Sequence, residues 1–150
     1  MARLARRDGL AYVGGMRVLF VCLGNICRSA AAEGVLRARR PDWQVDSAGT
    51  SDWHIGNPPY GPMQAEARDR GLDLSGQRAR QVSVADFAAF DRVLAMDASV
   101  LADLRGMPGG EMAELFGVAT GLGAHDVPDP YYTRDFAGCL DMIEAGCARL

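Results

Sequence analysis

The strongest constraint on the fold is the regular alternation of short apolar runs with segments of helical spacing. Three runs have strand character, at 16–21, 43–48 and 92–96, and a weaker one lies at 112–116. Apolar side chains recur at helical intervals over residues 29–40, 62–70, 84–90, 98–105 and 133–149. Strands separated by helices predict a parallel sheet covered by helices on both faces. We therefore predict an α/β protein.

The first 15 residues differ in composition from the rest of the chain. They are rich in arginine and end in Gly14-Gly15, directly before the first apolar run. We predict a flexible N-terminal extension at 1–15 and one folded domain at 16–150. The 150-residue chain is 49% hydrophobic and 23% charged, which is typical of a single globular domain with its own core.

The charged residues exclude several functions. All 16 basic residues are arginine, so no lysine is available for a Walker A motif, a Schiff base or a general base. The net charge of -3 argues against nucleic-acid binding, since proteins that follow the phosphate backbone are strongly basic. No apolar run is long enough for a secretory signal or a membrane span, so we expect a cytoplasmic protein without membrane insertion.

The segment VCLGNICRS, residues 21–29, occupies the position at which parallel sheets bind ligands. Cys22 directly follows the first apolar run, and ligands of such sheets lie beyond the carboxyl ends of the strands. Gly24 and Asn25 tolerate the backbone angles of a loop whose N–H groups turn inward, and the helix that follows favours a bound oxyanion. Arg28 supplies a planar fork for phosphate oxygens, and Ser29 can donate a hydrogen bond to a Cys22 thiolate. This pattern predicts a phosphate-binding loop with a nucleophilic cysteine.

Two simpler interpretations of the cysteines were weighed against this one. Cys22 and Cys27 could be ordinary buried cysteines, but the arginine and serine that follow an apolar strand at this spacing favour a reactive site. They could also bind zinc, yet the segment lacks the paired cysteines and histidines of a closed zinc site. We expect no metal and no cofactor.

Two long loops rich in turn residues extend over 47–59 and 121–132. Loops of this length on a rigid α/β scaffold are common places for functional residues. Asp129 lies between Pro128 and Pro130 in the second loop, and a carboxyl group in such a stiff segment is a plausible proton donor to a leaving group.

These motifs resemble those of the low-molecular-weight protein tyrosine phosphatase family. The loop VCLGNICRS matches nearly residue for residue, and four further segments follow in the family's order: VDSAGTSDW (45–53), RARQ (78–81), DFAAFDRVLAMD (86–97) and PDPYY (128–132). The resemblance covers residues 16–150. It implies a flavodoxin-like, four-stranded parallel sheet and hydrolysis of phosphate monoesters through a phosphocysteine.

The resemblance also assigns roles to individual residues. Cys22 corresponds to the nucleophile, Arg28 to the phosphate clamp and Asp129 to the general acid and base. The remaining loop residues are expected to line or shape the substrate site: Leu23, Gly24, Asn25, Ile26, Cys27 and Ser29. Trp53 matches an aromatic rim position, and with Tyr131 and Tyr132 it would form a slot deep enough for a phenyl phosphate.

Three more positions are interpreted through the family. Asn25 and Ser47 match residues that hold the loop's shape by hydrogen bonds, and Gln77 aligns where the family usually has a histidine as the third member of that network. Cys27 is expected to trap an oxidised Cys22 as a reversible disulfide.

Three rival functions remain open at this point. A thioredoxin-coupled arsenate reductase would need two further shuttling cysteines in mid-chain. The two cysteines outside the loop are Cys139 and Cys147, which lie near the end of the chain. A protein-arginine phosphatase would typically have threonine in place of Ile26. A non-catalytic phosphotyrosine reader would be expected to lose Cys22 or Asp129. We therefore expect a monomeric phosphatase whose partners are phosphotyrosine proteins, with a cognate tyrosine kinase among the candidates.

Overall fold

A computed structural model describes residues 15–150 of the chain. The extension predicted at 1–15 lies outside the described residues except for Gly15, whose N–H donates to the carbonyl oxygen of Asp42 at 3.4 Å.

The observed elements follow the predicted alternation. The strands are β1 (Arg17–Cys22), β2 (Gln44–Gly49), β3 (Arg92–Ala95) and β4 (Glu114–Leu115). The α-helices are α1 (Arg28–Arg39), α2 (Gly61–Asp69), α3 (Val84–Ala89), α4 (Ala98–Arg105), α5 (Phe116–Ala119), α6 (Pro130–Thr133) and α7 (Phe136–Cys147), with a 3-10 turn, η1, at Gly110–Met112. The short helices α5 and α6 were not predicted, and the helix expected over 133–149 corresponds to α7, which begins three residues later, at Phe136.

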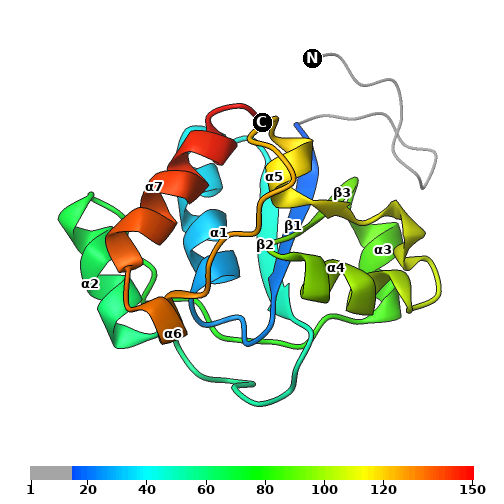
Figure 1. Cartoon of the computed structure of the whole chain (residues 1–150), viewed down its shortest axis with the longest axis horizontal. Coiled ribbons are helices and arrows are strands. Elements are labelled where there is room, and N and C mark those ends of the chain that lie inside the picture. The colour runs from blue at the N-terminus through cyan, green and yellow to red at the C-terminus, as the bar shows by residue number, and fades with distance from the viewer. Residues whose placement is uncertain (1–14) are drawn as a thin grey trace.

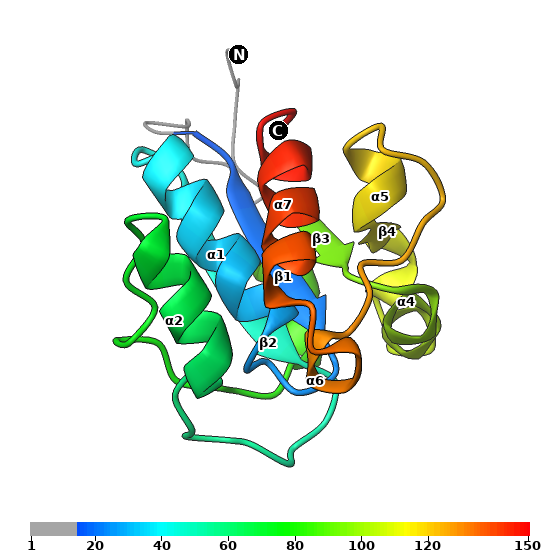
Figure 2. The same ribbon diagram turned by 60° about the vertical axis from the view of Figure 1, so that its left-hand side comes forward.

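All four strands are parallel, in the order β2-β1-β3-β4. Helices α1, α2 and α7 cover one face of the sheet, and α3 and α4 cover the other (Figure 1). The predicted four-stranded parallel sheet with helices on both faces is therefore confirmed. Figure 2 shows α1 and α7 lying side by side over the first of these faces.

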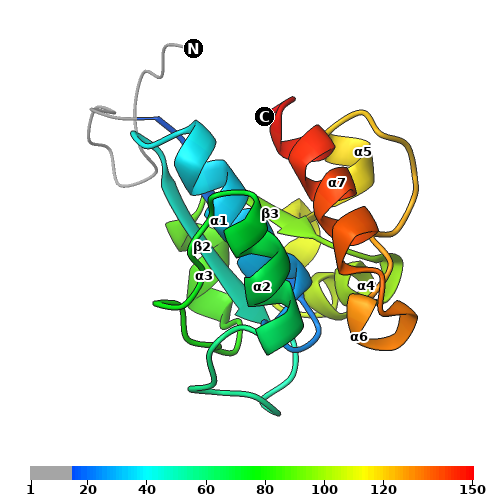
Figure 3. The ribbon, with the colours of Figure 1, turned by 90° about the vertical axis from the view of Figure 1, so that its left-hand side faces the viewer.

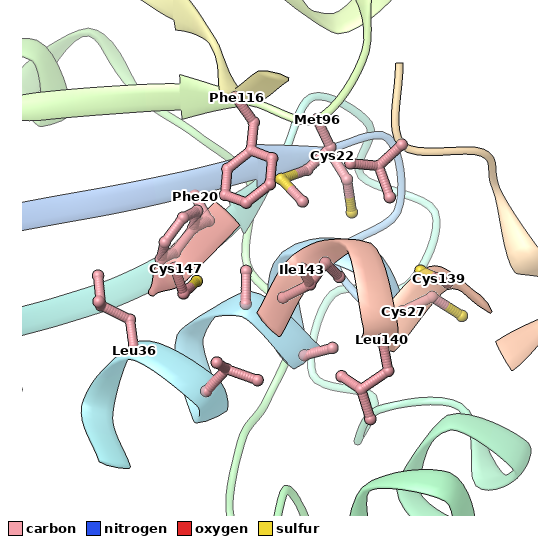
Figure 4. Packing of buried hydrophobic residues seen from close by; sticks show 14 of the residues in the cluster. Phe20, Cys22, Cys27, Leu36, Met96, Phe116, Cys139, Leu140, Ile143 and Cys147 are labelled. Carbon is pink, nitrogen blue, oxygen red and sulfur yellow. The ribbon is translucent and has the colours of Figure 1, made fainter. Parts of the chain in front are cut away.

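The strand β1 builds two cores because successive side chains point to opposite faces of a sheet. Val18, Phe20 and Cys22 belong to the larger core under α1 and α7, whereas Leu19 and Val21 belong to the smaller core under α3 and α4. Figure 4 shows the larger core, in which Phe20 and Phe116 pack edge to face. Residues in β1 from 18 onward are buried on both faces, which explains why their sequence is continuously apolar.

The carboxyl ends of the strands gather the segments that carry the candidate site. The β1–α1 loop, the loop that leads from β2 to α2, and α6 meet at this end of the sheet, shown at the bottom of Figure 1 and again in Figure 3. Within residues 15–150, no helix is long and apolar enough to cross a membrane.

Candidate active site

The loop between β1 and α1 curls around the sulfur of Cys22. Asn25 has a φ of 57°, a left-handed conformation that asparagine tolerates better than most residues. This turn brings the backbone N–H of Asn25 to 3.2 Å from Cys22 Sγ, where it donates a hydrogen bond. The side chain of Ser29, in the first turn of α1, lies 3.0 Å from the same sulfur. Backbone and hydroxyl donors thus converge on one buried thiol.

A chain of side-chain hydrogen bonds runs behind the loop. Asn25 Nδ2 donates to Ser29 Oγ at 2.8 Å and to Ser47 Oγ at 2.9 Å. Ser47 Oγ in turn donates to the carboxylate Oε1 of Glu33 at 2.6 Å. The backbone N–H of Arg80 donates to Asn25 Oδ1 at 3.0 Å and so fixes the orientation of the amide. Asn25 and Ser47 are thus linked to each other by a buried hydrogen bond behind the loop.

The direction of these hydrogen bonds leaves a proton for the sulfur of Cys22. Because Ser29 Oγ accepts from Asn25, its own proton is free to point at the sulfur 3.0 Å away. The network thus holds two donors, the backbone N–H of Asn25 and the hydroxyl of Ser29, against this sulfur.

Gln77 does not belong to this network, contrary to the prediction. Its Nε2 donates to the carbonyl oxygen of Ala30 at 3.0 Å, and its Oε1 is buried without a hydrogen-bond partner in the described part of the chain. Glu33 is the third member instead, because it lies four residues after Ser29 on the same face of α1. Gln77 supports the loop indirectly, through the first turns of α1.

Glu33 provides a test of the network through its protonation. Burial raises the pKa of this carboxyl, although Ser47 and Arg37 act in the opposite direction. The folded protein then binds this proton more tightly than the unfolded chain, so stability falls as pH rises from the ordinary glutamate pKa of about 4.3 through the folded pKa. We expect Glu33→Gln to remove this dependence, measured by urea unfolding across that interval. Glu111→Gln, at an exposed glutamate, is the control, and an equal pH dependence in wild type and Glu33→Gln would contradict the assignment.

Arg28 is buried and held by three oxygens. Its Nη1 donates to Asp97 Oδ2 at 2.6 Å and to the carbonyl oxygen of Val127 at 3.0 Å. Its Nη2 lies 3.5 Å from Asp129 Oδ2. Burial alone would lower the pKa of Arg28, but the neighbouring acidic groups Cys22, Asp97 and Asp129 outweigh it and raise the pKa. The guanidinium therefore stays charged, with a fixed orientation next to the thiol.

Sequence reasoning missed Asp97 as a site residue. Asp97 caps the N-terminus of α4, where its Oδ1 accepts from Val100 N at 2.8 Å, while its Oδ2 holds Arg28. The sequence did hold a signal for Asp97: it follows β3 closely, and so lies at the same edge of the sheet as Cys22, where ligands bind.

Asp129 lies at the start of α6, where its Oδ1 accepts from Tyr131 N at 3.0 Å. This hydrogen bond and the flanking prolines hold the carboxyl group at the wall of the site. Its second oxygen faces Arg28. Asp129 is therefore placed beside the guanidinium of Arg28, with one oxygen not used by the helix cap.

A pocket of about 200 Å³ opens over these groups. Its lining includes ten of the residues predicted for the site: Cys22, Leu23, Gly24, Ile26, Cys27, Arg28, Trp53, Asp129, Tyr131 and Tyr132. The rim is exposed and aromatic, with Trp53 at 68%, Tyr131 at 48% and Tyr132 at 73% exposure. Asn25, Ser29 and Ser47 are buried behind the lining. The pocket is thus polar at its floor and aromatic at its mouth.

Two further features complete the mouth. His54, which the site prediction left out, lines the pocket, and an added Cβ on Gly24 would lie 3.0 Å from its ring. Tyr131 is backed by Tyr60, with ring centroids 5.5 Å apart, and Arg134 covers the Tyr60 ring at 5.5 Å. The described part of the chain contains no group of three or more His, Cys, Asp or Glu side chains arranged to hold a metal ion.

A parallel α/β sheet with a cysteine-arginine loop under an aromatic pocket at its carboxyl edge defines a phosphatase. The family model for low molecular weight phosphotyrosine protein phosphatases matches residues 17–150. The chain belongs to this family.

Individual relatives agree with the assignment. The low molecular weight protein-tyrosine-phosphatase YfkJ of Bacillus subtilis is 42% identical over 143 residues, which cover 89% of this chain and 92% of the relative. The crystal structure of YfkJ matches with a TM-score of 0.84 at 40% identity, covering 92% of this chain and 94% of that one. A Drosophila arginine phosphatase, DARP, matches with a TM-score of 0.80 at 33% identity, covering 89% and 94%. The fold alone therefore does not choose between phosphate esters of tyrosine and phosphoarginine.

Proposed function

We propose that this phosphatase hydrolyses phosphotyrosine monoesters through a phosphocysteine intermediate. The observation that carries the proposal is the position of Cys22 Sγ, which receives hydrogen bonds from the loop at the floor of a pocket walled by Arg28 and Asp129. No other cysteine combines a pocket position with two such donors among residues 15–150.

The first step transfers the phosphoryl group to the enzyme. Cys22 thiolate attacks phosphorus in line with the tyrosine oxygen, and the P–O bond to the phenol breaks. Arg28 and the loop N–H groups bind the equatorial oxygens, on which negative charge is spread in the transition state. The protonated Asp129 donates its proton to the departing phenolate.

The second step restores the enzyme. Asp129, now a carboxylate, accepts a proton from water as the water oxygen attacks phosphorus. The P–S bond breaks, inorganic phosphate forms, and the electron pair returns to Cys22 as a thiolate. Ser29, 3.0 Å from the sulfur, stabilises that leaving group by its hydrogen bond.

The pocket supports phosphotyrosine over phosphoarginine. Ile26 is 9% exposed and contributes an apolar side chain to the lining, which suits the face of a phenyl ring better than a guanidinium group. The exposed aromatic rim lengthens the slot around such a ring. Matched peptides carrying phosphotyrosine or phosphoarginine test this choice, and faster turnover of the phosphoarginine peptide would reject it.

Asp129→Asn gives a second test, directed at the acid. Asparagine keeps the shape and can still accept from Tyr131 N, but it cannot donate a proton to a phenolate. We expect kcat for phenyl phosphate to fall by about 10²- to 10⁴-fold, the usual contribution of general acid-base catalysis. Esters with good leaving groups need no proton, so phosphorylation of the enzyme by them should be nearly unaffected. Equal losses for good and poor leaving groups, measured as single-turnover rates, would remove the acid role.

The rival functions find less support. Cys139 and Cys147 are buried in α7, and burial raises the pKa of each thiol to about 12, which disfavours shuttling between thiols as in an arsenate reductase. Both Cys22 and Asp129 are present in the pocket, which disfavours a reader that only binds.

The wider predictions belong to the same proposal. We propose that residues 16–150 act as a monomer on phosphotyrosine proteins, with a cognate tyrosine kinase as a candidate substrate. Cytoplasmic location and redox sensitivity through Cys27 stay predictions. Burial raises the pKa of Cys27 well above its ordinary value, which lowers its thiolate fraction and would slow its attack on an oxidised Cys22.

A further inference from the structure

A second hollow adjoins the active-site pocket across a single loop residue. Leu23 lines both, with Cys22 and the aromatic rim on one side and a hollow of about 390 Å³ on the other. The second hollow lies between the segment after β2, the segment before α3 and the end of α4. Residues near α3 and α4 contribute to its lining: Val82 precedes α3, and Asp103 and Met107 lie in and just after α4.

The walls of this hollow combine apolar surface with one unpaired charge. Leu23, Val82 and Met107 supply the apolar lining, and Val82 is buried while the other two are half-buried. Asp103 stands exposed at its edge, and its carboxylate has no ion pair or side-chain hydrogen bond with any described residue. An apolar channel that ends at a free carboxylate matches a long side chain with a methylene stem and a cationic head.

A second observation also indicates a missing hydrogen-bond donor. Thr50 lines the hollow, and its Oγ1 is buried without a hydrogen-bond partner among residues 15–150. Buried hydroxyl groups are nearly always paired in folded proteins. An N–H group that entered the hollow could supply that partner, provided that the threonine side chain turned toward it.

We propose that this hollow binds an arginine or lysine side chain of the substrate, close in sequence to the phosphotyrosine. This inference rests on the proposed function, because it places the peptide chain across Leu23 with the phosphotyrosine in one hollow and the basic residue in the other. Because Leu23 lines both hollows, the basic residue lies only a few positions from the phosphotyrosine along the extended peptide. The subsite would thus select the sequence around the phosphorylated tyrosine, whereas the pocket selects the phosphorylated group itself.

Phosphopeptides that differ at one position test the subsite. We expect kcat/KM to be about fivefold to tenfold higher with arginine or lysine than with alanine at one position, as an ion pair and a buried stem together allow. Asp103→Asn should remove most of this preference, and Asp103→Arg should turn it toward glutamate. Turnover of p-nitrophenyl phosphate, which does not reach the second hollow, should be unchanged in both variants.

Asp69→Arg is the matched control, since it makes the same charge change at an exposed aspartate at the end of α2. The basic preference should survive in this variant. A wild type that hydrolyses the peptides at equal rates, or a preference that persists in Asp103→Arg, would overturn the subsite while leaving the proposed function in place. A wild type that hydrolyses p-nitrophenyl phosphate but none of the phosphotyrosine peptides would overturn both.

Discussion

Cys22→Ser should abolish turnover while leaving phosphate binding within a few-fold of wild type. A serine hydroxyl at this position lacks a base to activate it, because the surrounding groups donate hydrogen bonds to the sulfur instead of accepting its proton. Loss of a covalent nucleophile typically costs about 10⁵-fold or more in kcat. Steady-state hydrolysis of p-nitrophenyl phosphate measures the loss, and isothermal titration with inorganic phosphate measures the retained affinity.

A second cysteine variant separates chemistry from packing. Cys147→Ala removes a thiol from the core at the end of α7, outside the pocket, and should lower stability without changing kcat. If Cys22→Ser, free of contaminating wild-type enzyme, kept more than a small percentage of wild-type activity, the assignment of Cys22 as nucleophile would be wrong. Loss of phosphate affinity along with activity would instead point to a collapsed loop.

Arg28→Ala should lower kcat by about 10³- to 10⁵-fold, the range for arginines that stabilise phosphoryl transfer. The guanidinium is the only cationic group among the residues that line the pocket with a fixed charge, and Asp97 and Val127 orient it before substrate binds. Arg28→Lys keeps the charge but loses the planar fork, so it should recover only a small part of the activity. Both kcat and the affinity for phosphate should be measured, because Arg28 would bind phosphate oxygens in the ground state as well as in the transition state.

Arg39→Ala is the control for the loss of positive charge, since Arg39 is exposed at the far end of α1. It should behave as wild type. An Arg28→Lys variant with nearly full kcat would show that charge alone suffices and would refute the role given to the fork.

Most of the fold could be predicted because it depends on local patterns. The apolar runs and helical spacing identified all four strands and the five longer helices to within a few residues. The short helices α5 and α6 escaped because four residues carry no periodic signal, and α6 begins at Pro130 after a cap that Asp129 provides. Their existence depends on packing and capping rather than on repeated side chains.

Contacts within the site could be predicted when both residues belong to one segment. Contacts between distant segments were harder to predict. Cys22, Asn25 and Arg28 share one loop, so their proximity follows from the sequence. Glu33 and Asp97 act on that loop through a helix face and a neighbouring strand end, and sequence order alone did not reveal either contact. Gln77 was misplaced because an alignment position fixes neither the direction of a side chain nor its partner.

The contact between Arg28 and Asp129 has a consequence for the end of the catalytic cycle. The Asp129 carboxylate lies 3.5 Å from the Arg28 guanidinium, which is the group that would bind the phosphate dianion. Once Asp129 has released the proton that it took from water, product and carboxylate compete for one cation, and the carboxylate is tethered at high local concentration. We expect Asp129 to act as an internal competitor that drives inorganic phosphate out, which would keep product inhibition weak in a pocket built to bind phosphate.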